Sequence, residues 1–506
     1  MKNLITKRQL LFVILVLLCG INPIYADTSK KLYVSDGNLS SLLPETERFK
    51  ITDLTLSGEL NIYDLEVIRQ MGRCWKSDGS QYDGHLRYLD LSNATFVGNG
   101  TLKIPNSNIT LQLNNGSGDC LFMEMKSLHT IKLPNSMEEM GSSLFWGCDS
   151  LTSVTLPKSL KSMSLNFVDN CNLTFILIDD SNPYYSSDGS ALFDKYKRKM
   201  IFAVSTLKEY AIPSSVSEIS KDAFYNCRHL KTLVLPLRLK RKEVPSFWDC
   251  DSLYSISVDE KNPYLCSDGS ALYNKDKSEL VFVCHTVRKI SIPSSVTEIG
   301  DYAFSKCTNL TSIELPLGVT LIGSDAFRNC TNLSSLILPS SVKEIWSWAF
   351  MGCKSLTSIT LPSGVENVWS RTFEGCESLK SITLPSDLKQ IEGDAFKGCN
   401  SLTSIYAFMK KPCKIQETTF DNETKINATL YVPKGSLLNY WDDNQWEKFM
   451  NIEEFDATSI GSLNTNANDV QEVSRYSDNG QRLNTPAKGL NIVKYNDGTV
   501  KKIMVK

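Results

Sequence analysis

Apolar residues in the middle of the chain alternate with polar ones in short runs. In residues 310–315, for example, Ile313 and Leu315 lie on one face and Ser312 and Glu314 on the other. Alternation with a period of two predicts a strand with one buried face. Each run ends at a proline, which lacks an N–H and so ends strand pairing. These prolines are Pro134, Pro157, Pro213, Pro236, Pro293, Pro316, Pro339, Pro362 and Pro385.

The run recurs at a fixed interval that cysteines mark. A constant spacing of 23 residues separates Cys307, Cys330, Cys353, Cys376 and Cys399. A fixed period of about 20 to 50 residues is typical of a solenoid, in which each coil is too small to bury its own apolar face. We predict a parallel sheet on one wall and a return wall that apolar residues such as Ile345 and Phe350 fill from inside.

Two coils carry an insertion. Cys171 and Cys227 are 56 residues apart, and Cys250 and Cys307 are 57 apart, so each gap holds one period and an insert. The inserts, at about 178–207 and 258–287, share the pattern Asn-Pro-Tyr-x-x-Ser-Asp-Gly-Ser-Ala-Leu. Each continues through a charged turn into a second apolar run, which predicts a β-hairpin.

The ends of the repeat depart from its pattern. The end of a solenoid must cover an apolar cross-section, so terminal units are atypical in sequence. We predict an N-terminal leader and capping region at 27–127, the solenoid at 128–407 and a C-terminal cap at 408–456. Ser, Asn, Thr and Gly then dominate a flexible linker at 457–470.

A small β element follows the linker at 471–506. Asn479-Gly480 and Asp497-Gly498 predict turns between short strands there.

The first 26 residues have the features of an export signal. Three basic residues precede the apolar run of residues 10–18, and Ala26 supplies a small residue at a cleavage point. We predict a signal peptide at 1–26; lipoprotein processing at Cys19 is less favoured because Leu18 precedes it. No other segment reaches the ~18 apolar residues that span a bilayer. We therefore expect no transmembrane helix in the mature chain.

Charge limits the classes of partner. Lys plus Arg number 54 and Asp plus Glu 56, which gives a net charge of -2. A balanced charge gives no global attraction to nucleic acid or to an anionic membrane. We expect no nucleic acid partner; the sequence leaves the oligomeric state open.

The cysteines of the repeat are predicted to be free. Coils in register lie ~4.8 Å apart with parallel side chains, whereas a disulfide needs Cβ atoms ~3.8 Å apart that point toward each other. We interpret the 23-spaced cysteines as buried thiols that act as small apolar residues. Cys266 and Cys284, which flank the predicted hairpin turn of the second insert, are instead predicted to face each other and form a disulfide. Two small buried residues are the alternative.

The outward positions of the strands form a stripe of mostly short hydroxyl side chains, such as Ser358 and Thr360. Serine and threonine suit an exposed strand, and they also suit a broad contact surface for protein or glycan. These two interpretations stay open at this point.

The return wall carries a more specific candidate for a binding surface than the hydroxyl stripe. Two adjacent coils have Trp346 and Trp369 at a position where other coils have Gly, Ser or Glu, and we expect the two indoles to stack. Trp348 and Tyr302 occupy another variable position of the same wall. Exposed tryptophan and tyrosine clusters are typical of binding hot spots and of platforms for sugars. Local packing against neighbouring side chains is the alternative.

The residues for catalysis or metal binding are missing from the sequence. The four histidines, His85, His129, His229 and His285, lie in four different contexts, without a metalloprotease motif, a nucleophile elbow or a phosphate-binding glycine loop. The two Ser-Asp-Gly sites lack the ligand count for Ca²⁺ and fit turns. We expect no enzyme, no cofactor and no metal site.

The repeat unit Cys-x-x-Leu-x-x-Ile-x-Leu-Pro-x-Ser-Val-x-x-Ile, with Ala-Phe near its end, resembles the BspA-like leucine-rich repeats of bacterial surface proteins over about residues 51–455. The inserts and the cap, with Trp446 and Ile452, are also similar to that family. The last element, with Gly480, Gly489 and a lysine-rich end, resembles the C-terminal sorting signals of type IX secretion in Bacteroidetes.

The resemblance implies a β-rich leucine-rich-repeat solenoid with terminal caps, exported to the cell surface (the outer membrane exterior) or secreted. Adhesion to a host extracellular matrix or cell-surface protein is the function it implies. Glycan capture for nutrient uptake is the alternative. The family supplies no binding residue, because its matching motifs are structural positions of the repeat.

Overall fold

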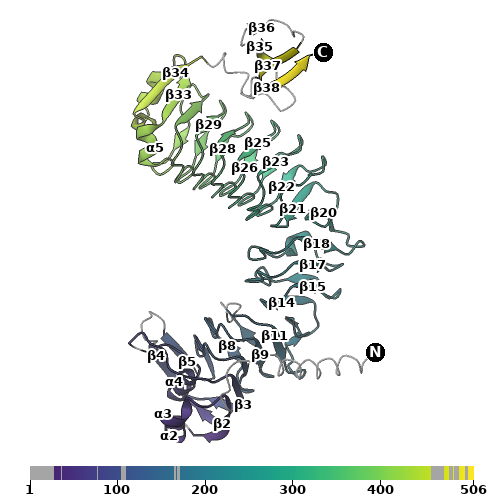
Figure 1. Ribbon diagram of the computed structural model, residues 1–506, viewed down its shortest axis with the longest axis vertical. Helices are drawn as coiled ribbons and strands as arrows, with labels where there is room; N and C mark the ends of the chain where they lie inside the picture. Colours follow the sequence, from purple (N-terminus) through teal and green to yellow (C-terminus); the bar gives the residue numbers. More distant parts are fainter. Residues whose placement is uncertain are drawn as a thin grey trace. The chain divides into compact units, whose positions relative to one another are not determined.

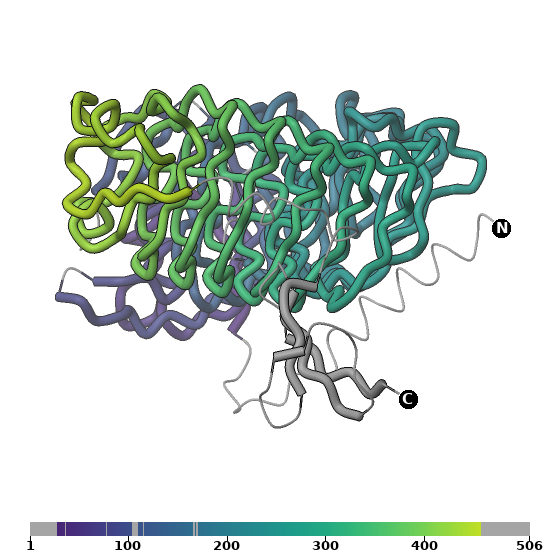
Figure 2. The backbone as a smooth tube through the Cα atoms, turned by 90° about the horizontal axis from the view of Figure 1, so that it is seen from above, coloured from purple at the N-terminus to yellow at the C-terminus, as the bar shows by residue number. Residues whose placement is uncertain are grey.

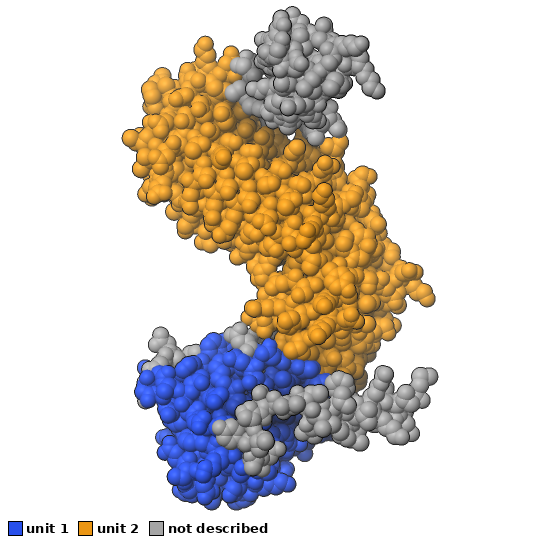
Figure 3. Space-filling model, in the orientation of Figure 1, with its two compact units in different colours: residues 1–184 blue, residues 185–506 orange. Residues whose placement is uncertain are grey.

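The computed structural model describes residues 28–35, 37–76, 78–103, 110–114, 116–164, 167 and 171–456, with the strands of a C-terminal sheet between 472 and 505. It has two compact units, residues 1–184 and 185–506 (Figures 1 and 3). Each unit is a stack of coils. The predicted signal peptide and the linker at 457–470 lie outside the described residues.

Unit 1 is built on one parallel sheet. Its strands, in spatial order, are β1 (Ser29–Val34), β2 (Asp53–Leu60), β3 (Tyr88–Phe96), β7 (Thr130–Lys132), β9 (Ser153–Leu156) and β11 (Phe175–Ile178). The sheet therefore begins at Ser29, about a hundred residues before the predicted start of the solenoid at 128. Sequence periodicity does not reveal these first coils because long excursions separate their strands.

Helices, a small antiparallel sheet and a short return wall connect the strands of unit 1. The helices are α2 (Leu39–Leu42), α3 (Glu45–Arg48) and α4 (Ile62–Met71), and the antiparallel strands are β4 (Asn99–Lys103), β5 (Thr110–Asn114) and β6 (Ser117–Asp119). The return-wall strands β8 (Glu139–Met140) and β10 (Ser162–Met163) pair in parallel. Asn61 and Asp64 form a capping box at the start of α4. Asp64 also accepts hydrogen bonds from the backbone N–H groups of Gly37 and Leu39, at 2.8 and 3.0 Å. The buried Asp64 carboxylate thus joins the first helical turns to α4.

Unit 2 repeats one coil, and its strands form the predicted parallel wall (Figure 2). They are β15 (Glu209–Ala211), β17 (Thr232–Leu235), β18 (Ser255–Val258), β23 (Ser312–Glu314), β25 (Ser335–Ile337), β27 (Ser358–Thr360), β29 (Ser381–Leu384) and β31 (Ser404–Ala407). Residues 23 apart pair in register, as Ile359 does with Ile382. The carbonyl of the proline after each strand accepts from the N–H three residues later, as in Val319 to Pro316 at 3.1 Å. These turns confirm the predicted role of the prolines.

The return wall of unit 2 consists of two-residue strands. They are β16 (Glu218–Ile219), β22 (Glu298–Ile299), β24 (Leu321–Ile322), β26 (Glu344–Ile345), β28 (Asn367–Val368), β30 (Gln390–Ile391) and β32 (Lys414–Ile415). A short 3₁₀ helix, η1 (Arg241–Glu243), replaces the return strand in one coil.

The inserts are three-stranded antiparallel meanders. They comprise β12 (Tyr185–Ser187), β13 (Ala191–Asp194) and β14 (Lys199–Ala203) in the first, and β19 (Leu265–Ser267), β20 (Ala271–Asn274) and β21 (Glu279–Val283) in the second. The predicted hairpins are confirmed as β13–β14 and β20–β21, each preceded by one further strand. Asp268 accepts from the N–H groups of Ser270 and Ala271, at 2.9 and 2.8 Å, so the Ser-Asp-Gly site is a turn.

Two ladders of identical side chains fill the core of unit 2. Phe304, Phe327, Phe350, Phe373, Phe396 and Phe420 stack with ring centroids 4.8–5.4 Å apart and interplanar angles of 4–10°. The cysteines lie beside them. From Cys330 to Cys399 each thiol donates to a phenylalanine carbonyl of the preceding coil, as Cys353 does to Phe327 at 3.2 Å and Cys376 to Phe350 at 3.3 Å. Cys307, which follows the second insert, donates to the Val283 carbonyl at 3.8 Å instead.

The prediction that the cysteine ladder consists of buried free thiols is confirmed, but the predicted disulfide is wrong. Cys266 and Cys284 are both free. Cys266 on β19 pairs with Tyr273 on β20, and Cys284 follows β21 on the far side of β20. Two inter-strand spacings of ~4.8 Å put the pair beyond the ~7 Å Cα separation that a disulfide tolerates. Cys284 is itself a ladder position, 23 residues before Cys307.

Burial predicts the order in which these thiols react. Desolvation raises the pKa of Cys148 and of Cys227 to about 12, whereas Cys266 is half-buried. Because the thiolate is the nucleophile, native protein treated with iodoacetamide at pH 8 is expected to be alkylated at Cys266 first among the described cysteines. Peptide mapping by mass spectrometry measures this. Equal labelling of Cys353 in the native state would contradict the buried ladder.

The C-terminal cap forms as predicted. It comprises α5 (Asn422–Asn427), β33 (Thr429–Pro433), α6 (Leu437–Trp441), η2 (Trp446–Lys448) and β34 (Asn451–Phe455). Trp446 is fully buried and donates its Nε1–H to the Cys413 carbonyl at 2.8 Å. It also lies over Phe420, the last ring of the ladder, with centroids 6.1 Å apart. The indole therefore closes the open end of the phenylalanine stack.

Beyond the linker, four antiparallel strands confirm the predicted small β element. They are β35 (Glu472–Ser477), β36 (Arg482–Leu483), β37 (Gly489–Tyr495) and β38 (Val500–Val505). Within the described part of the chain, the helices are all too short or too polar to span a bilayer.

Candidate binding surfaces of the second unit

The aromatic residues predicted to form a patch lie on a six-residue turn of the return wall, as Tyr302 and Trp348 do, or immediately before it, as Trp346 and Trp369 do. One position of this turn has positive φ in five successive coils: Tyr302 (59°), Asp325 (56°), Trp348 (58°), Arg371 (57°) and Asp394 (58°). The left-handed conformation costs a non-glycine residue roughly 1–2 kcal/mol. Hydrogen bonds between coils hold it, such as Trp348 N–H to the Ser370 carbonyl at 3.1 Å.

Three tryptophans of two adjacent coils are exposed at this turn or just before it. Trp346, Trp348 and Trp369 have 40%, 36% and 37% of their surface exposed. We call these three residues the tryptophan surface. The predicted stacking of Trp346 on Trp369 is wrong, since no ring contact joins these two described residues. The Trp346 indole instead donates to Glu344 at 2.9 Å.

Tyr302 does not join this surface. Asp325 lies between Tyr302 and Trp348 in the column of positive-φ residues, so two coil spacings separate the rings. Tyr302 packs edge-on against Trp248, with centroids 6.4 Å apart. Burial, reinforced by the Asp325 carboxylate, raises the pKa of Tyr302. The predicted patch therefore divides into two groups.

Sequence analysis missed Trp248, the centre of the second group. Lys306 Nζ lies 4.5 Å and the Arg328 guanidinium 5.0 Å from its ring centroid. Lys306 also donates to the Trp248 carbonyl at 2.9 Å. The sequence does distinguish this residue, because Trp248 stands two residues before Cys250, at a position where the later coils have Ser, Arg, Met, Glu or Lys.

The second insert creates a groove beside this group. Regular coils make the six-residue turn before their cysteine, but β21 runs straight into Cys284. The wall is consequently recessed at this coil. The groove has a volume of about 430 Å³ and is lined by Asp251, His285, Lys306, Thr308, Asn309, Asn329 and Thr331. We call it the His285 groove.

His285 is the buried polar residue of this groove. It is 5% exposed, packs against Phe282 with centroids 5.5 Å apart, and its Nδ1 has no hydrogen-bond partner. Burial lowers the pKa of His285 to about 4, and the Lys306 charge adds to this. The carboxylates of Asp251 and Asp249 oppose the shift. His285 is therefore neutral at physiological pH.

This neutral histidine predicts acid-sensitive stability. The folded pKa of about 4 lies below the ordinary value of 6.5, so the unfolded chain binds the proton more readily. Stability is then present above about pH 6.5 and lost as the pH falls toward 4, by about 2 kcal/mol between pH 7 and pH 5. Urea denaturation of the wild type and of His285→Leu measures it. An equal loss in both proteins would contradict this assignment.

The outer face of the parallel sheet carries a second aromatic pair. Tyr406 and Tyr431 pair in register and stack with centroids 4.7 Å apart at 11°. The neighbouring Thr383 is only 8% exposed, whereas Ile337 is 65% exposed. The predicted hydroxyl stripe is thus interrupted by apolar and aromatic side chains.

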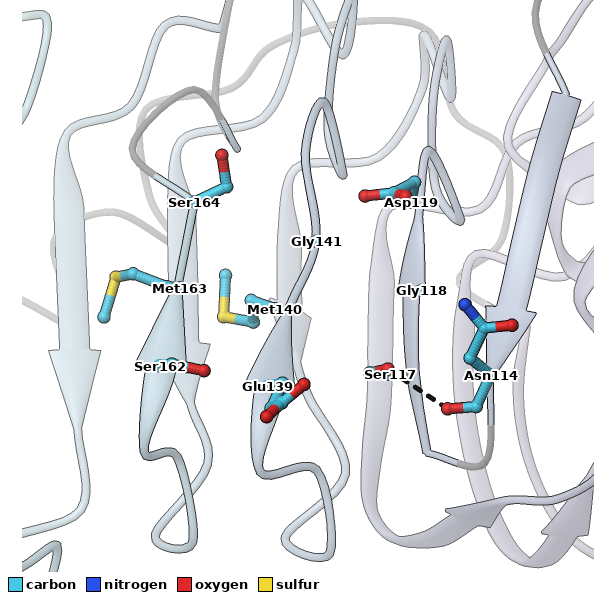
Figure 4. Close-up of a pocket in the computed structure, with 10 residues that line it drawn as sticks. All are labelled: Asn114, Ser117, Gly118, Asp119, Glu139, Met140, Gly141, Ser162, Met163 and Ser164. Carbon is cyan, nitrogen blue, oxygen red and sulfur yellow. Dashed lines mark hydrogen bonds between the residues drawn. The ribbon is translucent and has the colours of Figure 1, made fainter.

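Unit 1 has a smaller groove of about 280 Å³, lined by β5, β6, β8 and β10 (Figure 4). The carboxylate of Asp119, which lines this groove, accepts hydrogen bonds from the Ser142 hydroxyl at 3.0 Å and from the Ser142 backbone N–H. Because this carboxylate already joins one coil to the next, we assign it a structural role.

The remaining histidines lie apart from one another. His229 is exposed at the edge of its coil, and His85 and His129 contact the backbone carbonyls of Phe49 and Ser127 at 3.0 and 2.7 Å. Among the described residues, no three His, Cys, Asp or Glu side chains lie close enough together to hold a metal ion.

Comparison with solved structures finds similar bacterial proteins. A leucine-rich repeat protein of Eubacterium ventriosum is 20% identical with a TM-score of 0.48, covering 65% of this chain and 89% of that one. The pneumococcal vaccine antigen PcpA is 16% identical with a TM-score of 0.43, covering 85% and 89%. A leucine-rich cell surface protein of Faecalibacterium prausnitzii is 20% identical with a TM-score of 0.42, covering 66% and 92%.

A search of curated proteins finds no match. The family model of the BspA type leucine rich repeat region, by contrast, matches six copies, at residues 99–193, 198–281, 275–403 and 343–469. These residues include the second half of unit 1 and, in unit 2, the solenoid and the cap. The chain therefore belongs to the BspA type leucine rich repeat family.

Proposed function

We propose that this chain is an exported, non-enzymatic surface protein that binds a protein partner through the tryptophan surface. The observation that carries the proposal is the exposure of three indoles, 36–40% each, at the return-wall turns of two adjacent coils, with Trp346 and Trp348 on one coil and Trp369 on the next. Tryptophan is enriched among the residues that dominate binding energy at protein interfaces. Its ring offers a large apolar area with little conformational entropy to lose.

The architecture supports this use of the surface. The indoles project from turns whose backbone is fixed by hydrogen bonds between coils, such as Gly352 N–H to the Glu374 carbonyl at 2.7 Å. A rigid scaffold lowers the ordering cost of association. Extended surfaces of this kind are what solenoid proteins use for binding.

Family membership and sequence features support an extracellular partner. The proposed partners are host extracellular matrix or cell-surface proteins, reached after export through the predicted signal at 1–26. The C-terminal sheet at 471–506 is proposed to act as the sorting element of type IX secretion. Deleting it is expected to leave the protein in the periplasm, which immunoblotting of cell fractions would reveal.

The test is equilibrium binding of the mature chain to immobilised matrix proteins and to epithelial cells. Saturable binding is expected. A glycan array run in parallel distinguishes a protein ligand from a carbohydrate one. Binding to arrayed glycans alone, with none to any protein, would overturn the proposed protein partner.

A further inference from the structure

We propose that the His285 groove is a second binding site, separate from the tryptophan surface, and that it takes a neutral saccharide. The groove extends over four consecutive coils, and polar side chains line it throughout. Its volume of about 430 Å³ lies within the roughly 300–1,000 Å³ typical of small-molecule sites.

His285 supplies the first argument for a ligand. Buried polar atoms nearly always have a hydrogen-bond partner, so each exception needs an explanation. Nδ1 of His285 is such an exception among the described residues, in a side chain that is 95% buried and lines the groove. The imidazole ring itself lines the groove, and in its neutral form it has one donor and one acceptor nitrogen to offer a ligand hydroxyl.

The remaining lining residues supply both donors and acceptors. No hydrogen bond within the described protein uses the side chains of Asp251, Thr308 or Asn309, and all three are exposed at the mouth of the groove. The Thr308 hydroxyl and the Asn309 amide lie on one coil, and the Asp251 carboxylate lies two coils before them, with His285 on the coil between. Sugar hydroxyls both donate and accept, so they can bond to all three groups.

Other ligand classes fit less well. Lys306 would attract an anion, but its Nζ is already bonded to the Trp248 carbonyl and lies 3.6 Å from Asp249. The Asp251 carboxylate at the same groove would repel an anion. The polar lining offers little to an apolar molecule. The Trp248 ring has two cations over it and serves to fix Lys306 in position.

The first insert shows what distinguishes this coil. It has the same meander, but Ser205 stands where the second insert has His285. Both insert-bearing coils lack the six-residue turn, but only the second has His285 at this position. The groove therefore depends on this side chain as well as on the missing turn.

The experiment uses the mature full chain and a panel of neutral disaccharides: lactose, maltose, cellobiose and N,N′-diacetylchitobiose. Saturation-transfer NMR is expected to show transfer to at least one of them. The Hε1 resonance of His285 is expected to shift on titration, while those of the other three histidines stay fixed. Asp251→Ala and Asn309→Ala, both at exposed positions, are expected to raise the Kd at least tenfold.

His229→Ala is the matched control, since His229 is exposed at the same edge of another coil. It is expected to leave saccharide binding unchanged. Absence of transfer to every disaccharide, or affinities unaffected by both groove variants, would overturn the proposal. Displacement of the saccharide by an equal concentration of sodium sulfate would identify an anion site and overturn it as well. Binding of matrix proteins is expected to survive Asp251→Ala, so this proposal and the proposed function fail separately.

Discussion

Phe350→Ala is expected to destabilise unit 2 by about 3–5 kcal/mol. Phe350 is fully buried and stacks on Phe327 and Phe373, with centroids 5.3 and 5.4 Å away. Removing it opens a cavity between two coils and breaks both aromatic contacts. Because each coil packs only on its neighbours, the loss interrupts the stack at that point.

Denaturant unfolding of the mature chain, followed by circular dichroism, measures this loss. Leu317→Ala is the matched control, because Leu317 is 57% exposed on the same unit, and a change within about 0.5 kcal/mol is expected. Phe350→Leu keeps most of the volume and is expected to cost less than Phe350→Ala. A Phe350→Ala protein as stable as the Leu317→Ala control would show that the phenylalanine ladder does not support the fold.

The double substitution Trp346→Ala with Trp369→Ala is expected to weaken binding to the protein partner by at least about 2 kcal/mol, roughly 30-fold in Kd. Both indoles are partly exposed, so the variant is expected to fold. Trp441→Ala, at a 51% exposed tryptophan of α6 in the cap, is the control and is expected to bind like the wild type. Equal affinity of both variants would remove the tryptophan surface from the interface.

The repeat could be predicted from the sequence because each coil repeats the same local physics. Alternation located the strands, prolines located their ends, and the cysteine spacing set the register that pairs Ile359 with Ile382. The first coils of unit 1 were missed because α4 and the β4–β6 excursion interrupt the period.

The candidate sites were only partly predictable, because they depend on which coils become neighbours. Counting 23 residues placed the three tryptophans on adjacent coils, but it did not show that Trp346 turns toward Glu344. Nor could spacing show that β20 separates Cys266 from Cys284. The His285 groove lies at a coil that lacks the six-residue turn, and this lack becomes visible only when Cys284 is recognised as a ladder position.

Oxidative footprinting of the tryptophans in the bound complex tests the central claim most directly. Hydroxyl radicals oxidise exposed indoles, and mass spectrometry reports the oxidised fraction at each position. The account predicts that Trp346, Trp348 and Trp369 become protected on binding the partner while Trp441 oxidises as in the free chain. Unchanged oxidation of the three, with protection elsewhere on the chain, would contradict it.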